Sequence, residues 1–324
     1  MAPLIRLFQR YRVDLTALLV VTIWGVSFPF RKAALAQFDV LPFTALRFLG
    51  MLLLAWSVFA WHRHVTGDPG RIARADLPSL VLSGICGYTL YLVLGLVGLH
   101  YTTAFSNTLL LATTPLWAAL LLWGLRLEPV GRTQWLGMTL STLGVVAFVG
   151  EKIWSGLSTA SLGDLISLGA ALAFAAYMVA NKRLVRRYTA IVITTYTLTI
   201  GAIPALLLSL PTLGTQDWSR ITLLGWGALA WSVVLGSYLA WALWNWVIAR
   251  LGVARAAVFM PLVPVVSGAL SWLLLGEHFN ALKLLGALLT LSGLGLARRA
   301  DSAPSPRPVP EEPQVAGATH GGAS

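Results

Sequence analysis

Tyrosine, tryptophan and amide side chains lie within long apolar stretches of this sequence. Tyr88 and Tyr91 are three residues apart and therefore share one face of a helix. Trp241 and Asn245 are four residues apart and share a face in the same way. Aromatic rings attract cations, whereas hydroxyl and amide groups form hydrogen bonds to carboxylates. The pattern predicts a site for a small amphipathic molecule with a cationic group. The residues that we expect there are Trp24, Ser27, Tyr88, Tyr91, Asn107, Tyr177, Ser237, Tyr238, Trp241 and Asn245.

Two ordinary roles compete with ligand binding for such residues. Aromatic residues of membrane proteins often lie at the bilayer interface or pack against their neighbours. We favour this interpretation for Trp154, Trp218 and Trp226, which lie near the ends of apolar stretches. Asn107 either contributes to the site, caps the start of a helix or bonds to a neighbouring helix, and the sequence leaves these alternatives open.

Three prolines interrupt apolar stretches and are candidates for gating. Proline removes a backbone donor and frees the carbonyl four residues before it. In lipid, a freed carbonyl needs a partner from the protein or from a water-filled cavity. We therefore expect Pro115, Pro261 and Pro264 to mark helices that line a cavity or bend as its gates. A tolerated kink that faces a neighbouring helix is the alternative.

Few groups in the sequence are suited to catalysis. It has one cysteine, Cys86, and no HExxH, GxSxG or phosphate-loop motif and no His/Cys cluster with metal-ligand spacing. We therefore predict no enzymatic activity, no cofactor and no metal site. Arg47 is the single charge well inside an apolar stretch, where an ionisable residue is a functional candidate by default, and it lies close enough to the end of the stretch to reach the interface. Since no Asp or Glu lies in the middle of a stretch, we expect no buried proton-carrying carboxylate.

The elements that position these residues are apolar stretches that repeat along the chain. The 324 residues are 57% apolar and 11% charged. Stretches of about 18–22 residues cross roughly 30 Å of hydrocarbon, and backbone groups in lipid must bond within their own segment. The sequence therefore predicts an all-α integral membrane protein with ten transmembrane helices. The predicted helices are 13–34, 42–61, 77–99, 102–124, 132–150, 163–181, 190–211, 223–248, 253–275 and 281–297.

The chain has a net charge of +11, and the distribution of its basic residues indicates its orientation in the membrane. If the N-terminus is cytoplasmic, most of the 23 Lys and Arg residues fall in segments on the cytoplasmic side. This asymmetry follows the positive-inside rule, places both termini in the cytoplasm and argues against a nucleic-acid partner. The basic residues on the outer side are then Arg31, Lys32, Lys152, Arg220 and Lys283.

The chain repeats itself at an offset of 149 residues, as in Gly87/Gly236 and Pro115/Pro264. Five helices in each half mean that the second half starts on the opposite side of the membrane, so the repeats are inverted around a central cavity. Glu128 and Glu277 are also equivalent, and we expect them to cap the helices that follow. The predicted organisation is a cytoplasmic N-terminus 1–12, a first repeat 13–150, a linker 151–162, a second repeat 163–297 and a disordered cytoplasmic tail 298–324.

Several short motifs together resemble the EamA repeat of the drug/metabolite transporter superfamily, present twice across almost the whole chain. No single motif is specific to this family, but the order of the motifs and their recurrence at one offset are specific. The chain departs from the pattern in 173–177, which lacks a Trp-Gly pair, and in Tyr196, which stands where the repeat has Arg47. The motifs are Trp24-Gly25-Val26-Ser27-Phe28, Pro42 to Arg47, Leu111 to Leu116, Leu127-Glu128, Gly137, Gly144, Val263-Pro264, Gly276-Glu277, Gly286 and Gly293.

The resemblance implies a carrier that exports amino acids and related small amphipathic metabolites by alternating access from the bacterial inner membrane. It also implies a structural role for Arg47, paired with backbone carbonyls. The aromatic-rich central helices look most like the aromatic amino acid and paraquat exporters called YddG. The expected partners are the lipid bilayer and a small amino acid or organic cation, and the carrier is expected to be a monomer. One alternative is a sugar-nucleotide or phosphate-ester exchanger, against which the lack of mid-helix basic residues argues. The other is a polytopic membrane enzyme or sensor.

Overall fold

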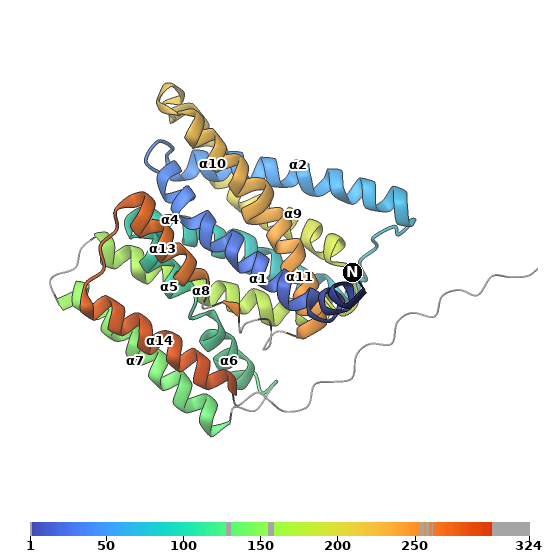
Figure 1. Ribbon diagram of the computed structural model, residues 1–324. Helices are drawn as coiled ribbons and strands as arrows, with labels where there is room; N and C mark the ends of the chain where they lie inside the picture. Colours follow the sequence, from blue (N-terminus) through green and yellow to red (C-terminus); the bar gives the residue numbers. More distant parts are fainter. Residues whose placement is uncertain are drawn as a thin grey trace, which may run out of the picture.

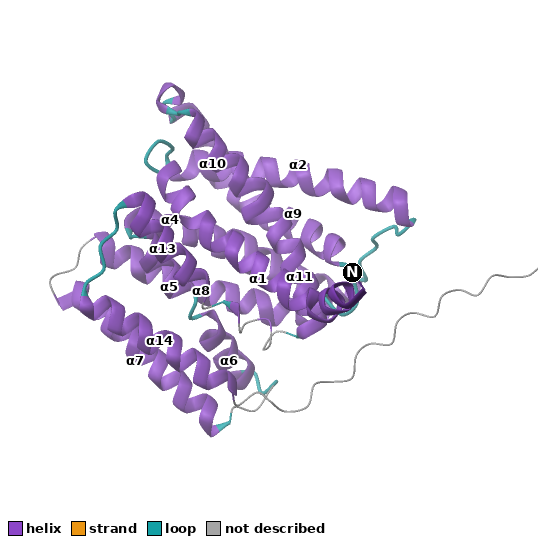
Figure 2. Ribbon diagram, in the orientation of Figure 1, coloured by secondary structure: helices purple, strands orange, loops and turns teal. Residues whose placement is uncertain are grey.

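The computed structural model describes residues 2–127, 131–154, 159–252, 256, 259–260 and 262–299. Within these residues all regular structure is helical, and short loops join the helices (Figure 2). The helices follow the apolar stretches of the sequence. Their bounds are α1 Ala2–Ala34, α2 Val40–Thr66, η1 Arg74–Asp76, α3 Leu77–Gly84, η2 Ile85–Leu90, α4 Tyr91–Tyr101, α5 Ala104–Leu111, α6 Thr114–Gly124, α7 Arg132–Trp154, α8 Thr159–Leu184, α9 Ala190–Ser209, η3 Leu210–Thr215, η4 Trp218–Arg220, α10 Leu223–Val233, η5 Val234–Leu239, α11 Ala240–Leu251, α13 Leu262–Leu275 and α14 Ala281–Arg299.

Some predicted features lie outside the described residues. These are Pro261, Glu128, the central part 155–158 of the predicted linker and the tail from residue 300 onwards. The helices α7 and α8 extend into the two ends of the predicted linker, because α7 continues to Trp154 and α8 begins at Thr159.

Seven helical segments among the described residues are long and apolar enough to cross a membrane. They are Tyr11–Ala34, Val40–Thr66, Arg74–Tyr101, Ala104–Gly124, Thr159–Leu184, Ala190–Thr215 and Leu223–Leu251. Three shorter apolar helices, Trp135–Ala147, Leu262–Leu275 and Leu284–Gly293, lie in the remaining predicted stretches. The described part of the chain is that of a helical membrane protein.

Each half of the chain contains a π-helical segment at the same place. The bounds of η2 and η5 differ by 149 residues, which is the offset of the sequence repeat. π-Helical turns are rare and often lie at functional sites. The two segments carry Tyr88 and Ser237, which are both predicted site residues.

Helices α7 and α14 lie side by side at one edge of the molecule (Figure 1). A β-carbon at Gly144 of α7 would overlap the backbone of Thr290, and one at Gly293 of α14 would overlap the backbone of Ser141. The two contacts are reciprocal, because Ser141 and Thr290 are also equivalent in the repeat. Small residues thus let these two helices approach closely.

A second reciprocal pair of contacts joins the halves near the centre of the molecule. Gly87 of η2 packs against the ring of Tyr177 in α8, and Gly236 of η5 packs against the hydroxyl of Ser27 in α1. The repeat-related glycines of the two π-helical segments therefore each pack against a helix of the other half.

A buried carboxylate, Asp76, fixes one connection between the helices. Asp76 is fully buried and accepts from Arg187 at 2.6 Å and from the Tyr188 hydroxyl at 2.7 Å. Arg183 lies 3.2 Å from the same carboxylate. These bonds fix the start of α3 to the end of α8.

Two further side chains cap helix ends next to the connection between α4 and α5. The Lys32 ammonium donates to three carbonyl oxygens at the end of α4, at 2.7–2.9 Å. Glu277 accepts from the first two backbone N–H groups of α5, at 2.8 and 3.3 Å. A cation at a helix C-terminus and an anion at an N-terminus are both stabilised there. The capping role expected for Glu277 is real, but the helix that it caps is α5 of the other half and not the following α14.

Candidate functional site

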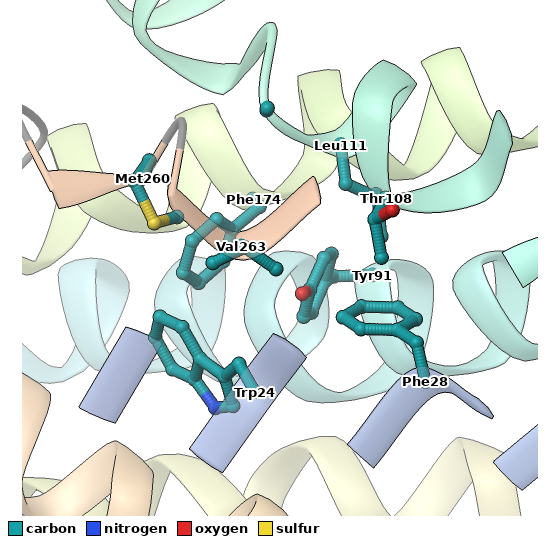
Figure 3. Close-up of a pocket in the computed structure, with 9 residues that line it drawn as sticks. Trp24, Phe28, Tyr91, Thr108, Leu111, Phe174, Met260 and Val263 are labelled. Carbon is teal, nitrogen blue, oxygen red and sulfur yellow. The ribbon is translucent and has the colours of Figure 1, made fainter. Parts of the chain in front are cut away.

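A cavity lies where the two halves meet. Figure 3 shows the side chains of Trp24, Phe28, Tyr91 and Phe174 pointing into the space between the helices. The first half contributes α1, α4 and α5, and the second half contributes α8 and the region of α13. The full lining is Trp24, Phe28, Tyr91, Thr108, Leu111, Ala112, Phe174, Met260 and Val263.

The walls of the cavity are aromatic faces held in fixed positions by one another. The rings of Tyr91 and Phe174 stack with centroids 4.5 Å apart. Trp24 meets Phe174 edge-on at 6.2 Å and lies 5.2 Å from Trp244. Such a wall binds apolar groups and offers ring faces to a cation. Two predicted site residues, Trp24 and Tyr91, line this cavity.

Three other predicted aromatic residues form a packed layer behind the cavity. Tyr88, Tyr177 and Trp241 are at most 1% exposed. The ring of Trp241 lies 4.3 Å from that of Tyr88, 4.9 Å from Tyr177 and 5.8 Å from Tyr91. These residues therefore support the wall at Tyr91 and do not line the cavity in this conformation.

Asn245 and Tyr177 belong to a polar network that links four side chains. The Tyr177 hydroxyl donates to the Asn245 amide oxygen at 2.7 Å, and the Asn181 amide donates to the same oxygen at 2.9 Å. The Asn245 amide nitrogen donates to the Thr194 hydroxyl at 2.8 Å. All four residues are buried. The network holds α8, α9 and α11 together and already uses the donors that we expected for a ligand carboxylate.

Asn107 bonds to neighbouring helices, which is one of the alternatives that the sequence leaves open. Its amide nitrogen donates to the Ser167 hydroxyl at 2.8 Å and to the Gly95 carbonyl at 3.2 Å. These bonds join α5 to α8 and α4. The next residue, Thr108, is the one that lines the cavity.

The remaining predicted residues lie at the contact between α1, α2 and η5. The Ser27 hydroxyl donates to the Ile23 carbonyl at 2.6 Å and accepts from the Trp231 indole at 2.9 Å. Ser237 is fully buried, and Tyr238 is 5% exposed. None of these three side chains is in the lining of the cavity.

Arg47 is buried, but its partner differs from the one expected. Its Nε and one terminal nitrogen donate to the Ser237 hydroxyl at 3.1 and 2.7 Å. The prediction of backbone carbonyl partners is wrong, because the π-helical segment η5 presents the Ser237 hydroxyl to α2. Arg47 is 2% exposed, so it does not reach the membrane surface.

Arg31 is a second buried arginine, which the sequence placed in an outer connection. Helix α1 continues past it to Ala34, and the side chain is only 8% exposed. Its Nε donates to the Ser27 carbonyl at 3.1 Å, and its guanidinium lies 4.3 Å from the centre of the Phe28 ring. Arg31 thus adds a buried basic residue in the last turn of α1, whereas the sequence argued only that basic residues are lacking in the middle of the helices. The helical bond back to Ser27 and the face of Phe28 keep this charge inside.

The prolines lie at breaks that face the cavity. The predicted helix 102–124 is divided into α5 and α6, and Pro115 occupies the first turn of α6. The carbonyl of Leu111, which Pro115 leaves without its helical donor, accepts from the Thr114 hydroxyl at 2.7 Å. Pro264 lies in the first turn of α13, next to the lining residue Val263.

Two carboxylates are buried near helix ends. Besides Asp76, Asp164 in the second turn of α8 is fully buried and accepts from the Thr102 hydroxyl at 2.6 Å. The sequence did not predict this burial, because both residues lie close to the ends of apolar stretches. Neither carboxylate lines the cavity.

Several lining residues carry little signal in the sequence. Met260, Leu111 and Val263 are ordinary apolar residues, and only their closeness to the prolines marks them. Phe28 follows Ser27 within the first motif, and Thr108 follows Asn107, so the prediction was one residue away in both places. For Arg31 the sequence did contain a signal, because its spacing of four from Ser27 places the two residues on the same face of a helix.

Taken together, the helical fold and the internal cavity define a polytopic membrane protein built from two repeats. The family profile of the EamA-like transporter family matches residues 12–150 and 161–299, which is nearly all of the described chain. The protein belongs to this family of membrane transporters.

Three relatives of the chain are named as transporters or exporters. The chain is 30% identical to the "Uncharacterized transporter YyaM" of Bacillus subtilis over 68% of its length and 73% of the relative. It is 27% identical to the "Probable terminal-alkyne amino-acid exporter" of Streptantibioticus cattleyicolor, with coverages of 87% and 91%. It is also 27% identical to the "Probable amino-acid metabolite efflux pump" of Salmonella typhimurium, with coverages of 86% and 92%. Amino-acid exporters are thus among the proteins that this chain resembles.

Proposed function

We propose that this protein exports amino acids and related small amphipathic metabolites by alternating access. In this proposal residues 13–150 and 163–297 form two inverted repeats of five membrane-spanning helices each. Both termini lie in the cytoplasm, at the inner membrane of a bacterium. The observation that carries the proposal is the aromatic cavity at the junction of the halves, because repeat transporters bind their substrates there.

The chemistry of the cavity favours a molecule with an ammonium group and an apolar body. The rings of Trp24, Tyr91 and Phe174 line the space that such a molecule would enter. A cation over an aromatic face gains about 0.5–2 kcal/mol, which binds it without the trap that a fixed opposite charge would create. Weak contacts of this kind suit a carrier, which must also release its substrate.

The proposed driving force is the gradient of the substrate itself. A proton-coupled carrier would need a carboxylate that changes its protonation in contact with the cavity. Asp76 is held by two arginines and Asp164 by Thr102, away from the lining. We therefore propose facilitated export that does not depend on a proton gradient.

Counterflow in proteoliposomes tests the proposal. Vesicles loaded with unlabelled amino acid should take up a labelled trace of the same amino acid faster than protein-free vesicles. A panel of apolar, polar and charged amino acids and organic cations then ranks the substrates. If no member of the panel exchanges, the proposed function is wrong.

One observation favours a second candidate, a carrier of phosphate esters. Such substrates need buried basic residues, and the structure contains two, Arg47 and Arg31, of which Arg31 contacts the lining residue Phe28. The same vesicles distinguish the two candidates, because a phosphate-ester exchanger should accept sugar phosphates and ignore free amino acids.

A further inference from the structure

The two buried arginines lack an opposite charge of their own. Arg31 and Arg47 are 8% and 2% exposed, and neither has an ion pair with a carboxylate among the described residues. A buried charge is costly unless it is paired and hydrogen-bonded. Two such charges side by side add mutual repulsion. An anion between them would relieve both costs.

Most hydrogen-bond donors of the two groups are unused within the described residues. A guanidinium has five N–H donors. Arg31 uses its Nε alone, on the Ser27 carbonyl. Arg47 uses two donors, and both point to the single Ser237 oxygen. The terminal nitrogens of Arg31 therefore remain available to a ligand, as does one edge of Arg47.

The arginines lie beside the cavity and not elsewhere in the membrane region. The Arg31 guanidinium covers the ring of Phe28, which is a lining residue. Arg31 and Arg47 interact electrostatically with each other and with the hydroxyl of Tyr91, another lining residue. Arg31 therefore lies directly behind the lining residue Phe28, and Arg47 is the next positive charge in the same region.

The amides that the sequence offered for a carboxylate already donate to protein atoms, Asn245 to Thr194 and Asn107 to Ser167. The Ser237 hydroxyl accepts from Arg47 and so lies beside that guanidinium. Ser27 donates to the Ile23 carbonyl. A carboxylate at this site would therefore find its donors on the arginines, whose planar groups bind carboxylates through two parallel hydrogen bonds.

We propose that Arg31 and Arg47 form the subsite for the substrate carboxylate, with the Tyr91 hydroxyl beside it. This rests on the proposed function and narrows the substrate class to amino acids with an apolar side chain. The carboxylate binds at the arginine end, and the ammonium next to it faces the ring of Tyr91. The apolar side chain then extends along Trp24, Phe174 and Met260.

Competition against counterflow of labelled phenylalanine tests the subsite. The competitors are phenylalanine, phenylalaninamide and phenyl phosphate, which share a ring but differ in the group offered to the arginines. In the wild type, phenylalaninamide should compete at least tenfold more weakly than phenylalanine. Equal competition by the amide overturns the proposal. Stronger competition by phenyl phosphate overturns the carboxylate assignment in favour of a phosphate site.

Variants of Arg31 test whether the preference for phenylalanine over phenylalaninamide depends on this side chain. Arg31→Gln keeps a donor for the Ser27 carbonyl, and Arg31→Lys keeps the charge but loses the planar pair of donors. Both should reduce the preference for the acid over the amide by tenfold or more. Arg220→Gln, in the exposed η4, is the matched control and should keep the wild-type preference.

Binding of phenylalanine to purified protein, measured as thermal stabilisation in detergent, gives the same comparison for a variant that transports poorly. A preference unchanged in both Arg31 variants overturns the proposal, whereas exchange of no amino acid by the wild type would instead refute the proposed function.

Discussion

The Arg47 guanidinium and the Ser237 hydroxyl join the two halves of the molecule across 190 positions of the sequence. The bond connects α2 of the first half to the π-helical segment η5 of the second. The equivalent of Arg47 in the second half is Tyr196, which packs against Trp56 and Phe59 at 5.9 and 5.7 Å. The two repeats therefore differ at this position by a buried charge.

Loss of the Ser237 hydroxyl should destabilise the protein. Ser237→Ala leaves the buried Arg47 without its partner, and a hydrogen bond to a charged group contributes about 1.5–3 kcal/mol. We expect the midpoint of thermal unfolding in detergent to fall by several degrees. Ser232→Ala is the matched control, because Ser232 is equally buried and its hydroxyl has no partner among the described residues. An equal fall in both variants would contradict the role of the Arg47 bond.

Two glycines of α14 should respond in opposite ways to the same substitution. Gly293→Ala forces a β-carbon into the backbone of α7 and should cost about 1–3 kcal/mol of stability. Gly295→Ala meets nothing within 4 Å and should be neutral or stabilising, since alanine favours a helix by about 0.5–1 kcal/mol over glycine. Thermal unfolding of both variants checks the contact. Equal stability of the two would mean that α7 and α14 do not pack as the structure has them.

Replacement of the prolines should slow transport without unfolding the protein. Pro115→Ala restores a backbone donor to the carbonyl of Leu111, which now relies on the Thr114 hydroxyl. The break between α5 and α6 beside the cavity should then stiffen. We expect a lower rate of counterflow and an unchanged or higher midpoint of unfolding for Pro115→Ala and Pro264→Ala. Wild-type rates in both variants would refute gating at these breaks.

The proposed topology places the C-terminal tail in the cytoplasm. Cys86 is the single cysteine, so a Cys86→Ala background allows a label to report one position. A cysteine introduced by Ser302→Cys should react with a membrane-impermeant maleimide in inverted vesicles but not in intact cells. Labelling in sealed intact cells would contradict the topology.

The repeat allowed much of the fold to be predicted, because one offset fixes many positions together. The small residues of α7 and α14 are such a case, since the close contact at Gly144 and Gly293 needs nothing more than their spacing. The ends of the helices were harder. Arg31 lies at the end of the predicted helix 13–34, next to Lys32, and only the packed structure shows that it is buried and that Phe28 covers the guanidinium.

The aromatic character of the site could be predicted from the sequence, but the set of residues that line the cavity could not. Tyr91 and Trp24 line the cavity as expected. Both carry a polar group that needs a hydrogen-bond partner, and this marks them when they lie deep in an apolar stretch. Tyr88 and Tyr177 are equally deep in the sequence, but in the structure their rings pack against Trp241. Sequence spacing gives the face of one helix and cannot tell which face of the neighbouring helix meets it. For the same reason the donors of Asn245 could not be known to be occupied.

The most direct test of the central claim is counterflow of labelled apolar amino acids with two matched tryptophan variants. Trp24 lines the cavity, whereas Trp218 lies in η4 and is 40% exposed. Wild-type vesicles should exchange the amino acid, Trp24→Leu should lower the initial rate by tenfold or more, and Trp218→Leu should keep it. Folded Trp24→Leu protein that exchanges every amino acid at the wild-type rate would contradict the account.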